Sequence, residues 1–268
     1  MMTTESTPVT RAADPPRLRP VVAIVERYLT LYRRLWQASV FSSFILPILF
    51  LVSIGIGVGG YVGSVEGVDY LSWIVPGVLV STAFQICVGE STYPVLGDFK
   101  WVRAYHAMRA APVSPKDIVH GHLIYMIFRV ELAIAAFLLV VVFFDGLHSP
   151  WALATVPICA LLTAAVVTPV AAFAASIESD SYFALLFRFV VIPATLFSGV
   201  FFPVEQLPAA IRPVAYASPV WHAVELSRAA TLGRAPGWPI LVHVGYLLLW
   251  AVVGLIAARR VFARRLED

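Results

Sequence analysis

The sequence predicts an all-α integral membrane protein with six transmembrane helices. Of its 268 residues, 60% are hydrophobic and only 13% are charged, whereas about 25% of an ordinary soluble domain is charged. The charged residues are also clustered, so that long apolar stretches lie between them. A compact soluble fold cannot bury so much apolar side chain. The composition therefore excludes a soluble enzyme, a nucleic-acid-binding module and a disordered chain, and no nucleic-acid partner is expected.

Each of the six apolar stretches is long enough to span a bilayer, which takes roughly 20 residues in a helix. Alternating segments of about ten residues, which are typical of a transmembrane β-barrel, are absent from the sequence. The predicted spans cover residues 39–60, 70–92, 118–144, 151–177, 181–201 and 239–258.

The positions of Lys and Arg predict the orientation of the spans. These residues precede the first span, lie between the second and third, and follow the sixth, but none occurs in the loops 61–69 and 145–150. In membrane proteins the cytoplasmic loops carry the excess of Lys and Arg. We therefore expect a multi-pass protein of a bacterial-type plasma or inner membrane, with both termini in the cytoplasm.

The residues before the first span predict two regions. Residues 1–18 are polar and rich in proline, which suggests a disordered cytoplasmic tail. Within residues 19–38, apolar side chains such as Ile24 and Tyr28 recur at three- and four-residue spacing, which predicts an amphipathic interface helix. Such a stripe suits a helix in the headgroup plane, although it would also serve a helix packed on a partner protein. Residues 39–268 form the predicted six-helix transmembrane domain.

The cytoplasmic loop of residues 98–117 is the most informative soluble stretch. Its sequence predicts a short helix in which Trp101, Tyr105 and Met108 share one face. The basic residues elsewhere on this helix are Lys100, Arg103 and Arg109. A short amphipathic helix between two spans can insert into a groove on another protein. A helix that only rests on the membrane is the alternative.

The segment of residues 201–238, between the fifth and sixth spans, has a different pattern. Prolines divide it into two short apolar helices, expected near residues 205–216 and 219–232. Neither is long enough to cross the bilayer. We expect a re-entrant segment of two half-helices that enter the membrane from the outer side and satisfy their own backbone hydrogen bonds.

Four residues of the Asp, Glu, Lys and Arg types fall inside predicted spans: Glu90, Arg129, Glu131 and Arg188. An ionisable side chain in a membrane is costly unless it finds a partner, so each is a candidate functional residue. Arg129 and Glu131 are two residues apart and do not face each other on a helix. One interpretation is that these residues form interhelical ion pairs. The other is that they line a polar translocation path or transmit a conformational signal.

The sequence contains none of the common motifs of an enzyme active site. It has no Gly-x-x-x-x-Gly-Lys-Ser/Thr loop, no His-Glu-x-x-His and no Gly-x-Ser-x-Gly. His120 and His122 come closest to a metal pair, but a two-residue spacing places them on different faces of a helix. Cys87 and Cys159 fall inside predicted spans and are interpreted as packing residues. We expect no catalytic residue, metal site or cofactor in this chain.

The order of these elements and a carboxy-terminal pattern resemble a known family. The pattern combines Ser-Gly, an aromatic pair before Pro, and a proline-led helix that ends near an Arg. Its residues are Ser198, Gly199, Phe201, Phe202, Pro203, Pro219, Trp221, Glu225 and Arg228. From about residue 20 onwards the chain resembles the permease subunits of type-2 ATP-binding-cassette (ABC) exporters, nearest the nodulation-type lipo-oligosaccharide and daunorubicin-type drug exporter branches.

The resemblance implies how such a chain would work. In this family two permeases pair, here expected to be identical, and two separate ABC ATPase subunits hold ATP and Mg. Residues 100–111 would be the coupling helix seated in the ATPase, residues 21–37 the interface helix, and residues 205–232 the outer gate. The implied function is outward transport of an amphiphilic lipid-, glycolipid- or lipo-oligosaccharide-like substrate. The alternatives are a drug or antibiotic efflux permease of the same family and, more distantly, a membrane-embedded hydrolase or transferase.

Overall fold

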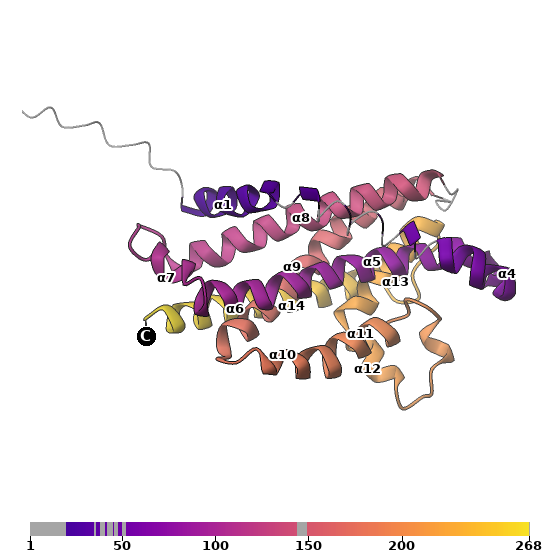
Figure 1. Cartoon of the computed structure of the whole chain (residues 1–268). Helices are drawn as coiled ribbons and strands as arrows, with labels where there is room; N and C mark the ends of the chain where they lie inside the picture. The colour runs from indigo at the N-terminus through magenta and orange to yellow at the C-terminus, as the bar shows by residue number, and fades with distance from the viewer. Residues whose placement is uncertain are drawn as a thin grey trace, which may run out of the picture.

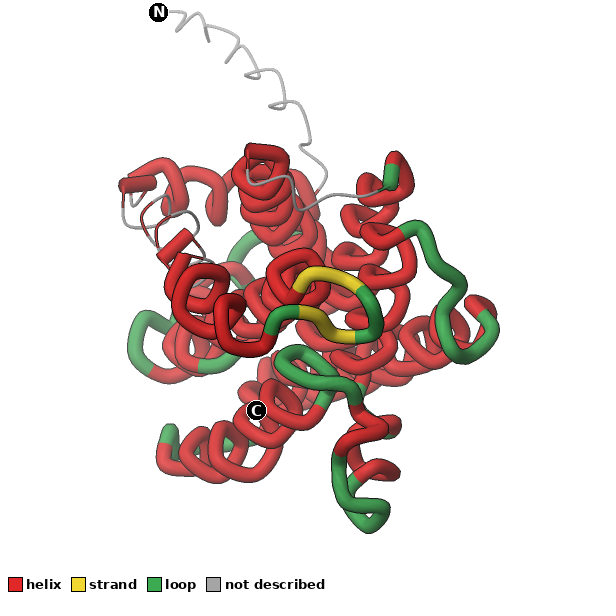
Figure 2. The backbone as a smooth tube through the Cα atoms, turned by 90° about the vertical axis from the view of Figure 1, so that its right-hand side faces the viewer, coloured by secondary structure: helices red, strands yellow, loops and turns green. Residues whose placement is uncertain are grey.

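The computed structural model describes residues 20–34, 36–37, 41, 45, 48–49, 52–143 and 149–267. Most of its helices run along one common direction (Figure 1). At one end of the bundle lie α7 (Ala104–Met108) and the C-terminus, and we call this the α7 end. At the other end lies a hairpin of β1 (Ser64–Val65) and β2 (Val68–Asp69), which faces the viewer in Figure 2 and defines the hairpin end.

Four of the six predicted spans are confirmed as helices long and apolar enough to cross a membrane, namely the second, third, fourth and sixth. They cover Tyr70–Lys100, Pro115–Val142, Pro150–Ser176 and Ile240–Glu267. Their elements are α5 (Tyr70–Ser91) with α6 (Tyr93–Lys100), α8 (Pro115–Phe143), the 3₁₀ helix η3 (Pro150–Ala154) with α9 (Thr155–Ser176), and α14 (Ile240–Glu267). Pro94 separates α5 from α6, because proline has no backbone N–H and its ring crowds the carbonyl one turn earlier.

The fifth predicted span is shorter than expected. The helix expected over residues 181–201 ends at Phe197, so it has fewer than 18 residues. Its parts are α10 (Ser181–Leu186), the π-helix η4 (Phe187–Val191) and α11 (Ile192–Phe197). Pro193 accounts for the π segment, because proline cannot donate the backbone hydrogen bond that continues an α-helix. The residues after Phe197 form a turn instead.

The first predicted span, residues 39–60, lies largely outside the described residues. Its described part includes the π-helix η2 (Ser53–Val58) and the start of α4 (Gly59–Val62). The hairpin follows directly, and its turn residues Glu66 and Gly67 have φ angles of +53° and +75°. Two consecutive positive φ angles are what a two-residue hairpin turn requires. This hairpin is a small correction to the all-α expectation.

Helix α9 lies at the centre of the bundle, where it packs against α5, α8, α13 and α14. It approaches α14 closely at Gly254, where a Cβ atom would lie 2.4 Å from the Thr168 hydroxyl oxygen and 2.6 Å from the Pro169 ring. Only glycine allows two backbones to come so close. The opposite face of α14 exposes apolar side chains such as Leu241 and Leu249, which suits contact with acyl chains.

Helix α14 is longer than the sequence analysis indicated, because it continues beyond residue 258 to Glu267. The buried residues of this extension recur every four positions: Ala258, Phe262 and Leu266. The extension also carries Arg265, whose Nη1 donates hydrogen bonds of 2.7 Å to the carbonyls of Ala175 and Ile177. These carbonyls lie at the C-terminal end of α9, where a cation is stabilising.

The amphipathic helix expected at the amino terminus is confirmed as α1 (Pro20–Arg34). It lies lengthwise along α8. Ile24 packs on Gly121, where a Cβ atom would lie 2.5 Å from the Ile24 side chain, and the Arg129 guanidinium lies 5.1 Å from the Tyr32 ring centre. These contacts are eight residues apart on both helices, so α1 runs parallel to α8. The expected orientation of α1 in the headgroup plane stays a prediction.

Of the two expected half-helices, only the second forms with the predicted bounds. α13 (Pro219–Leu232) has the expected bounds, and it begins where the Ser218 hydroxyl caps the helix. The helix expected over residues 205–216 is wrong, because only the 3₁₀ turn η5 (Val204–Gln206) and the five-residue α12 (Arg212–Tyr216) form there. Pro208 explains the interruption, since proline lacks a backbone N–H and disfavours helical geometry at the preceding residue.

Candidate functional site

The residues of the carboxy-terminal pattern meet at the hairpin end, around the side chain of Arg228. Arg228 extends from α13 and is only 8% exposed. Its Nη2 donates a hydrogen bond of 2.6 Å to the Gly199 carbonyl, and its Nη1 donates one of 3.0 Å to Glu225 Oε1. Its guanidinium also lies 4.0 Å from the ring centre of Trp73. One cation therefore ties α13 to the turn after α11 and to α5.

The turn after α11 depends on two glycines. Gly199 has a φ of +74°, a conformation that costs other L-residues roughly 1–2 kcal/mol. Gly77 on α5 lets the turn approach, because a Cβ atom there would lie 2.6 Å from the Val200 carbonyl oxygen. The Ser198 hydroxyl donates a hydrogen bond of 2.9 Å to Ser218 Oγ. The turn is thereby fixed to the start of α13.

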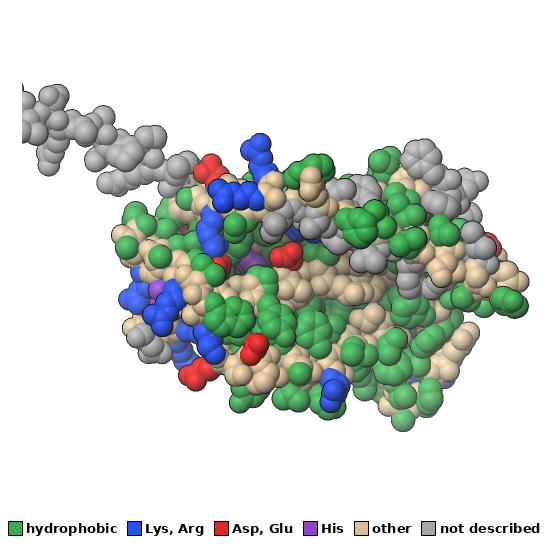
Figure 3. Space-filling model, in the orientation of Figure 1, with side chains coloured by type: hydrophobic (Ala, Val, Ile, Leu, Met, Phe, Trp, Pro, Cys, Tyr) green, Lys and Arg blue, Asp and Glu red, His purple; other side chains and the backbone are tan. Residues whose placement is uncertain are grey.

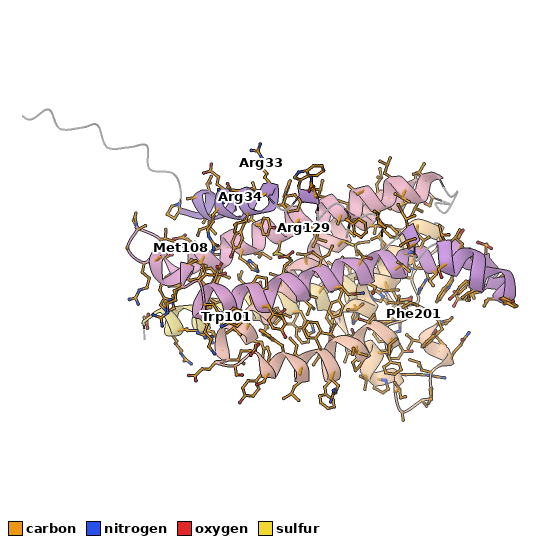
Figure 4. All side chains as sticks on the ribbon, viewed as in Figure 1. Arg33, Arg34, Trp101, Met108, Arg129 and Phe201 are labelled. Atoms are coloured by element: carbon orange, nitrogen blue, oxygen red, sulfur yellow. The ribbon has the colours of Figure 1, made fainter. Side chains whose placement is uncertain are left out.

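The aromatic and proline residues of the pattern pack around this turn. Pro203 is buried, and Phe201 and Phe202 are half-buried. The Phe201 carbonyl accepts a hydrogen bond of 3.4 Å from the Tyr70 hydroxyl, and Figure 4 shows Phe201 at the hairpin end of the bundle. Phe202 packs against a small apolar cluster that contains Trp221. The whole pattern thus forms one packed unit, which we call the Arg228 cluster.

A polar pocket of about 210 Å³ lies beside the Arg228 cluster. The carboxylates of Glu66, Glu205 and Glu225 line it, together with the guanidinium groups of Arg228 and Arg234. Glu225 and Arg228 form an ion pair of 3.0 Å. The pocket therefore brings acidic residues from three separate segments, the hairpin turn, the η5 turn and α13, to one place.

A buried pair of histidines, which the sequence did not indicate, lies beside Trp221. His222 on α13 and His243 on α14 approach to 2.9 Å between their Nδ1 atoms. His222 Nε2 also lies 3.1 Å from the Tyr216 carbonyl oxygen. No short motif indicates this pair, because 21 residues separate its members. Among the described residues, no group of three His, Cys, Asp or Glu side chains is arranged to hold a metal ion.

At the α7 end, the expected coupling helix over residues 100–111 is interrupted. Lys100 ends α6, and Arg103 has a φ of +53°, which breaks the helix before α7 begins. The expectation that Trp101, Tyr105 and Met108 share one helical face is therefore wrong. Trp101 is 56% exposed, whereas Tyr105 is completely buried.

The buried side chain of Tyr105 supports this loop from within. Its hydroxyl lies 2.8 Å from the Tyr28 hydroxyl of α1. Its ring packs against Phe99 and Phe262, with ring centres 4.8 Å and 5.6 Å away. Burial raises the pKa of both Tyr28 and Tyr105. Both phenols therefore stay neutral, and one of them donates its hydroxyl proton to the other.

A second contact joins α1 to the same loop. Nη1 and Nη2 of Arg27 donate hydrogen bonds of 2.9 Å and 2.8 Å to the two carboxylate oxygens of Asp98, which is a bidentate ion pair. Burial by itself would lower the pKa of Arg27, but the hydrogen bond and the charge of Asp98 outweigh it, and the pKa is raised. Lys100 Nζ donates a hydrogen bond of 2.7 Å to the Glu178 carbonyl. These contacts hold the loop firmly against the bundle.

The outer face of the loop is apolar and basic, and we call it the α7 surface. It consists of Trp101, Val102, Arg103 and Arg109, all of which are exposed. Met108 is half-buried and packs against the core, and Figure 4 shows both Trp101 and Met108 at the α7 end. On the face drawn in Figure 3, Lys and Arg side chains gather at this end, while hydrophobic side chains cover much of the remainder.

The ionisable residues inside the predicted spans have different surroundings. Arg129 is buried on α8 and packs against Tyr32 of α1. Both carboxylate oxygens of Glu131 are buried without a hydrogen-bond partner among the described residues. Glu90 is half-buried and Arg188 is exposed. The roles expected for these four residues, as interhelical ion pairs or as the lining of a polar path, stay predictions.

His120 and His122 point to different helices, as their spacing predicts. His120 contacts Arg259 of α14, whereas His122 Nε2 lies 3.3 Å from Ser91 Oγ at the end of α5. The two histidines therefore belong to separate contacts. The two cysteines of the chain are both buried in the bundle.

Comparison with known proteins gives one matching family model and several relatives. The family model described as ABC-2 type transporter matches residues 19–232. Nodulation protein J of Rhizobium leguminosarum bv. viciae is 27% identical over 245 residues, which cover 91% of this chain and 94% of that protein. Nodulation protein J of Neorhizobium galegae is 27% identical over 262 residues, 97% of this chain and 99% of that protein. The inner membrane transport permease YadH of Escherichia coli (strain K12) is 23% identical over 226 residues, 82% of this chain and 86% of that protein.

Proposed function

The chain belongs to the ABC-2 type transporter family, and on that premise we propose that it is the membrane-spanning permease subunit of an ATP-driven exporter. In this proposal it moves an amphiphilic substrate, of the lipid, glycolipid or lipo-oligosaccharide kind, outward across a bacterial cell membrane. The names of its relatives, nodulation protein J and inner membrane transport permease, support this class of function. The α7 end is then cytoplasmic, and the hairpin end faces outward.

One observation carries the proposal: the exposed α7 surface is mounted on a buried support. Trp101 and Val102 are 56% and 69% exposed, while Tyr105 and Asp98 anchor the same loop to α1. Exposed aromatic and Arg side chains on a fixed backbone are the usual anchors of a protein interface. Permeases of this family generally pair with an ABC ATPase. We propose that the ATPase binds the α7 surface.

ATP and Mg²⁺ belong to that ATPase in this proposal, since the chain has no P-loop sequence. The complete transporter would contain two identical permeases and two ATPase subunits. Nucleotide binding and hydrolysis then shift the populations of inward-open and outward-open states of the permease. The Arg228 cluster would form the outer gate, because it links α5, α13 and the turn after α11.

The test is reconstitution of the purified chain in vesicles, with and without its partner ATPase. The complex should carry a labelled lipo-oligosaccharide or glycolipid across the vesicle membrane only when ATP is present. The chain alone should neither hydrolyse ATP nor transport. Nucleotide turnover by the lone chain would contradict the proposal.

The two alternatives give different results in the same vesicles. A drug efflux permease would transport a labelled antibiotic and leave the glycolipid in place. A membrane-embedded hydrolase or transferase would depend on its polar side chains, so Ala substitutions at His120, His122, Glu90 and Glu131 should abolish a bond-breaking activity. Full ATP-driven transport by the two His variants rules out the metal-dependent form of that enzyme.

A further inference from the structure

A cleft of about 610 Å³ lies at the hairpin end, between α9, α13 and α14. Among the described residues that line it, Arg234 is the one charged residue, and most of the others are apolar. Several lining residues are exposed, including Trp151 and Ile240. The cleft is therefore open to the surroundings of the bundle, which at the depth of these helices are lipid.

The depth of the cleft corresponds to one leaflet of a bilayer. Its wall runs from Trp151 in η3 to Leu161 in α9, which is about 17 Å at roughly 2.0 Å per residue in the 3₁₀ helix and 1.5 Å per residue in the α-helix. The hydrocarbon core of a bilayer is about 30 Å thick, so half of it matches this length. Trp151 is 72% exposed at the rim of the cleft. In membrane proteins, Trp side chains are enriched at the level of the lipid headgroups.

The end of α13 places Arg234 at this rim. Gly233 has a φ of +67°, and the backbone N–H groups of Gly233 and Arg234 both donate to the Ala229 carbonyl, which terminates the helix. Arg234 Nη1 donates a hydrogen bond of 3.1 Å to the Glu66 carbonyl. A guanidinium has five N–H donors, and this bond uses one of them. The exposed Arg234 can therefore present further donors to an anion at the rim.

We propose that this cleft binds a phospholipid from the leaflet at the hairpin end, with an acyl chain in the cleft and the phosphate on Arg234. The apolar walls match the chain, and the single guanidinium at headgroup level matches the phosphate in charge and geometry. This lipid is a structural ligand bound outside the Arg228 cluster. The inference therefore goes beyond the proposed transport activity and does not depend on it.

The polar pocket beside the cleft sets a preference among headgroups. The cleft and the pocket share Ala229, Arg234, Ala235 and Pro236, so they are adjacent. The carboxylates of Glu66 and Glu205 line the pocket and would repel a second negative charge on the headgroup. An ammonium group on the headgroup would instead face these carboxylates. The site should therefore bind phosphatidylethanolamine more tightly than phosphatidylglycerol.

The experiment measures thermal unfolding of the purified full chain in detergent. Phosphatidylethanolamine should raise the Tm, because a ligand that binds the folded state stabilises it. Phosphatidylglycerol should raise it less, and diacylglycerol with the same acyl chains should have little effect. Arg234→Gln should weaken the apparent affinity for phosphatidylethanolamine about tenfold. Lys116→Gln, which removes one exposed charge at the α7 end, should leave it unchanged.

A second variant tests the cleft without changing charge. Ala230→Trp should fill the cleft and remove one bound lipid per chain in native mass spectrometry, whereas Ala209→Trp, at an exposed turn outside the cleft, should retain it. An equal Tm shift with diacylglycerol, or a wild-type response in Arg234→Gln, would overturn the proposal. The proposal would also be overturned if Ala230→Trp changed the oligomeric state while the bound lipid was retained. The cleft would then be an interface between copies of the chain. None of these readouts needs ATP or transport, so failure here is distinguishable from failure of the proposed function.

Discussion

The two ends of the bundle hold their loops in different ways. At the hairpin end, the buried guanidinium of Arg228 joins segments that are far apart in the sequence, and two glycines let the backbones approach. At the α7 end, separate side-chain pairs join α1 to the loop, and the outer face of the loop is exposed. The difference shows that the pattern residues at the hairpin end are used in contacts within the protein, whereas Trp101, Val102, Arg103 and Arg109 at the α7 end stay exposed.

The two arrangements should also respond differently to substitution. A buried ion pair that loses one partner is destabilised by several kcal/mol, because the remaining charge is poorly solvated. Where a glycine contacts backbone atoms, a new Cβ atom is destabilising because backbone atoms cannot move aside as a flexible side chain would. A neutral pair of hydroxyls costs less to break, and an exposed side chain costs least. We therefore expect the loss of stability to decrease in this order.

The largest effect is expected for Arg228→Ala. The substitution leaves Glu225 and the Gly199 carbonyl without their donor, and should lower the free energy of unfolding by about 3 kcal/mol. Denaturant unfolding in detergent micelles measures this loss. Arg33→Ala, the same change at an exposed position of α1, is the control. The double variant with Glu225→Gln and Arg228→Ala should recover part of the lost free energy of unfolding. If it recovers none, the unpaired Glu225 carboxylate is not the cause of the destabilisation.

Alanine substitutions at two glycines of α5 should change the stability in opposite directions. Gly77→Ala forces a Cβ atom to within 2.6 Å of the Val200 carbonyl oxygen and should destabilise the protein by about 1–3 kcal/mol. Gly89 has nothing within 4 Å of its Cβ position, so Gly89→Ala should be neutral or stabilise the helix by up to about 1 kcal/mol. Thermal unfolding of both variants checks the difference. Equal effects would show that the close approach at the hairpin end is not rigid.

Much of this architecture could be predicted from the sequence where the determinants are local. The span lengths follow from apolar runs between charges, and the bounds of α13 follow from Ser218 and Pro219 at its start and Gly233 after its end. The excess length of α14 could not be predicted, because its extension is polar on one side and is held by Arg265 on the end of α9.

The candidate site was predicted only in part, because its contacts are long-range. The pattern indicated Arg228, but not that it meets Trp73, 155 positions earlier in the chain (228 − 73). The spacing of Trp101, Tyr105 and Met108 indicated one continuous helix, but the positive φ at Arg103 interrupts that helix. Arg is not a residue that normally adopts such a conformation, so nothing in the sequence marks the break. The inward direction of Tyr105 then follows from its partner on α1.

A smaller effect is expected for Tyr105→Phe at the α7 end. The substitution leaves the buried Tyr28 hydroxyl without its 2.8 Å partner and should cost about 1–2 kcal/mol of unfolding free energy. Tyr28→Phe should cost a similar amount. Because the two hydroxyls bond to each other, the double variant should lose less than the sum of the two, by about 1 kcal/mol. Strict additivity in this cycle would show that the hydroxyl pair does not hold α1 to the loop.

The smallest effect on stability, and the most specific effect on function, is expected for Trp101→Ala. Trp101 is 56% exposed, so the unfolding free energy should change by no more than about 0.5 kcal/mol. If the α7 surface binds the ATPase, loss of this aromatic anchor should weaken that binding at least tenfold. Tyr61→Ala, which removes a 94% exposed aromatic ring at the hairpin end, should leave ATPase binding intact. Pull-down of the ATPase by each variant, together with ATP-driven transport, measures the contrast. Equal binding by the two variants would contradict the division of roles between the two ends, because the exposed face of the loop would then be no different from any other exposed surface.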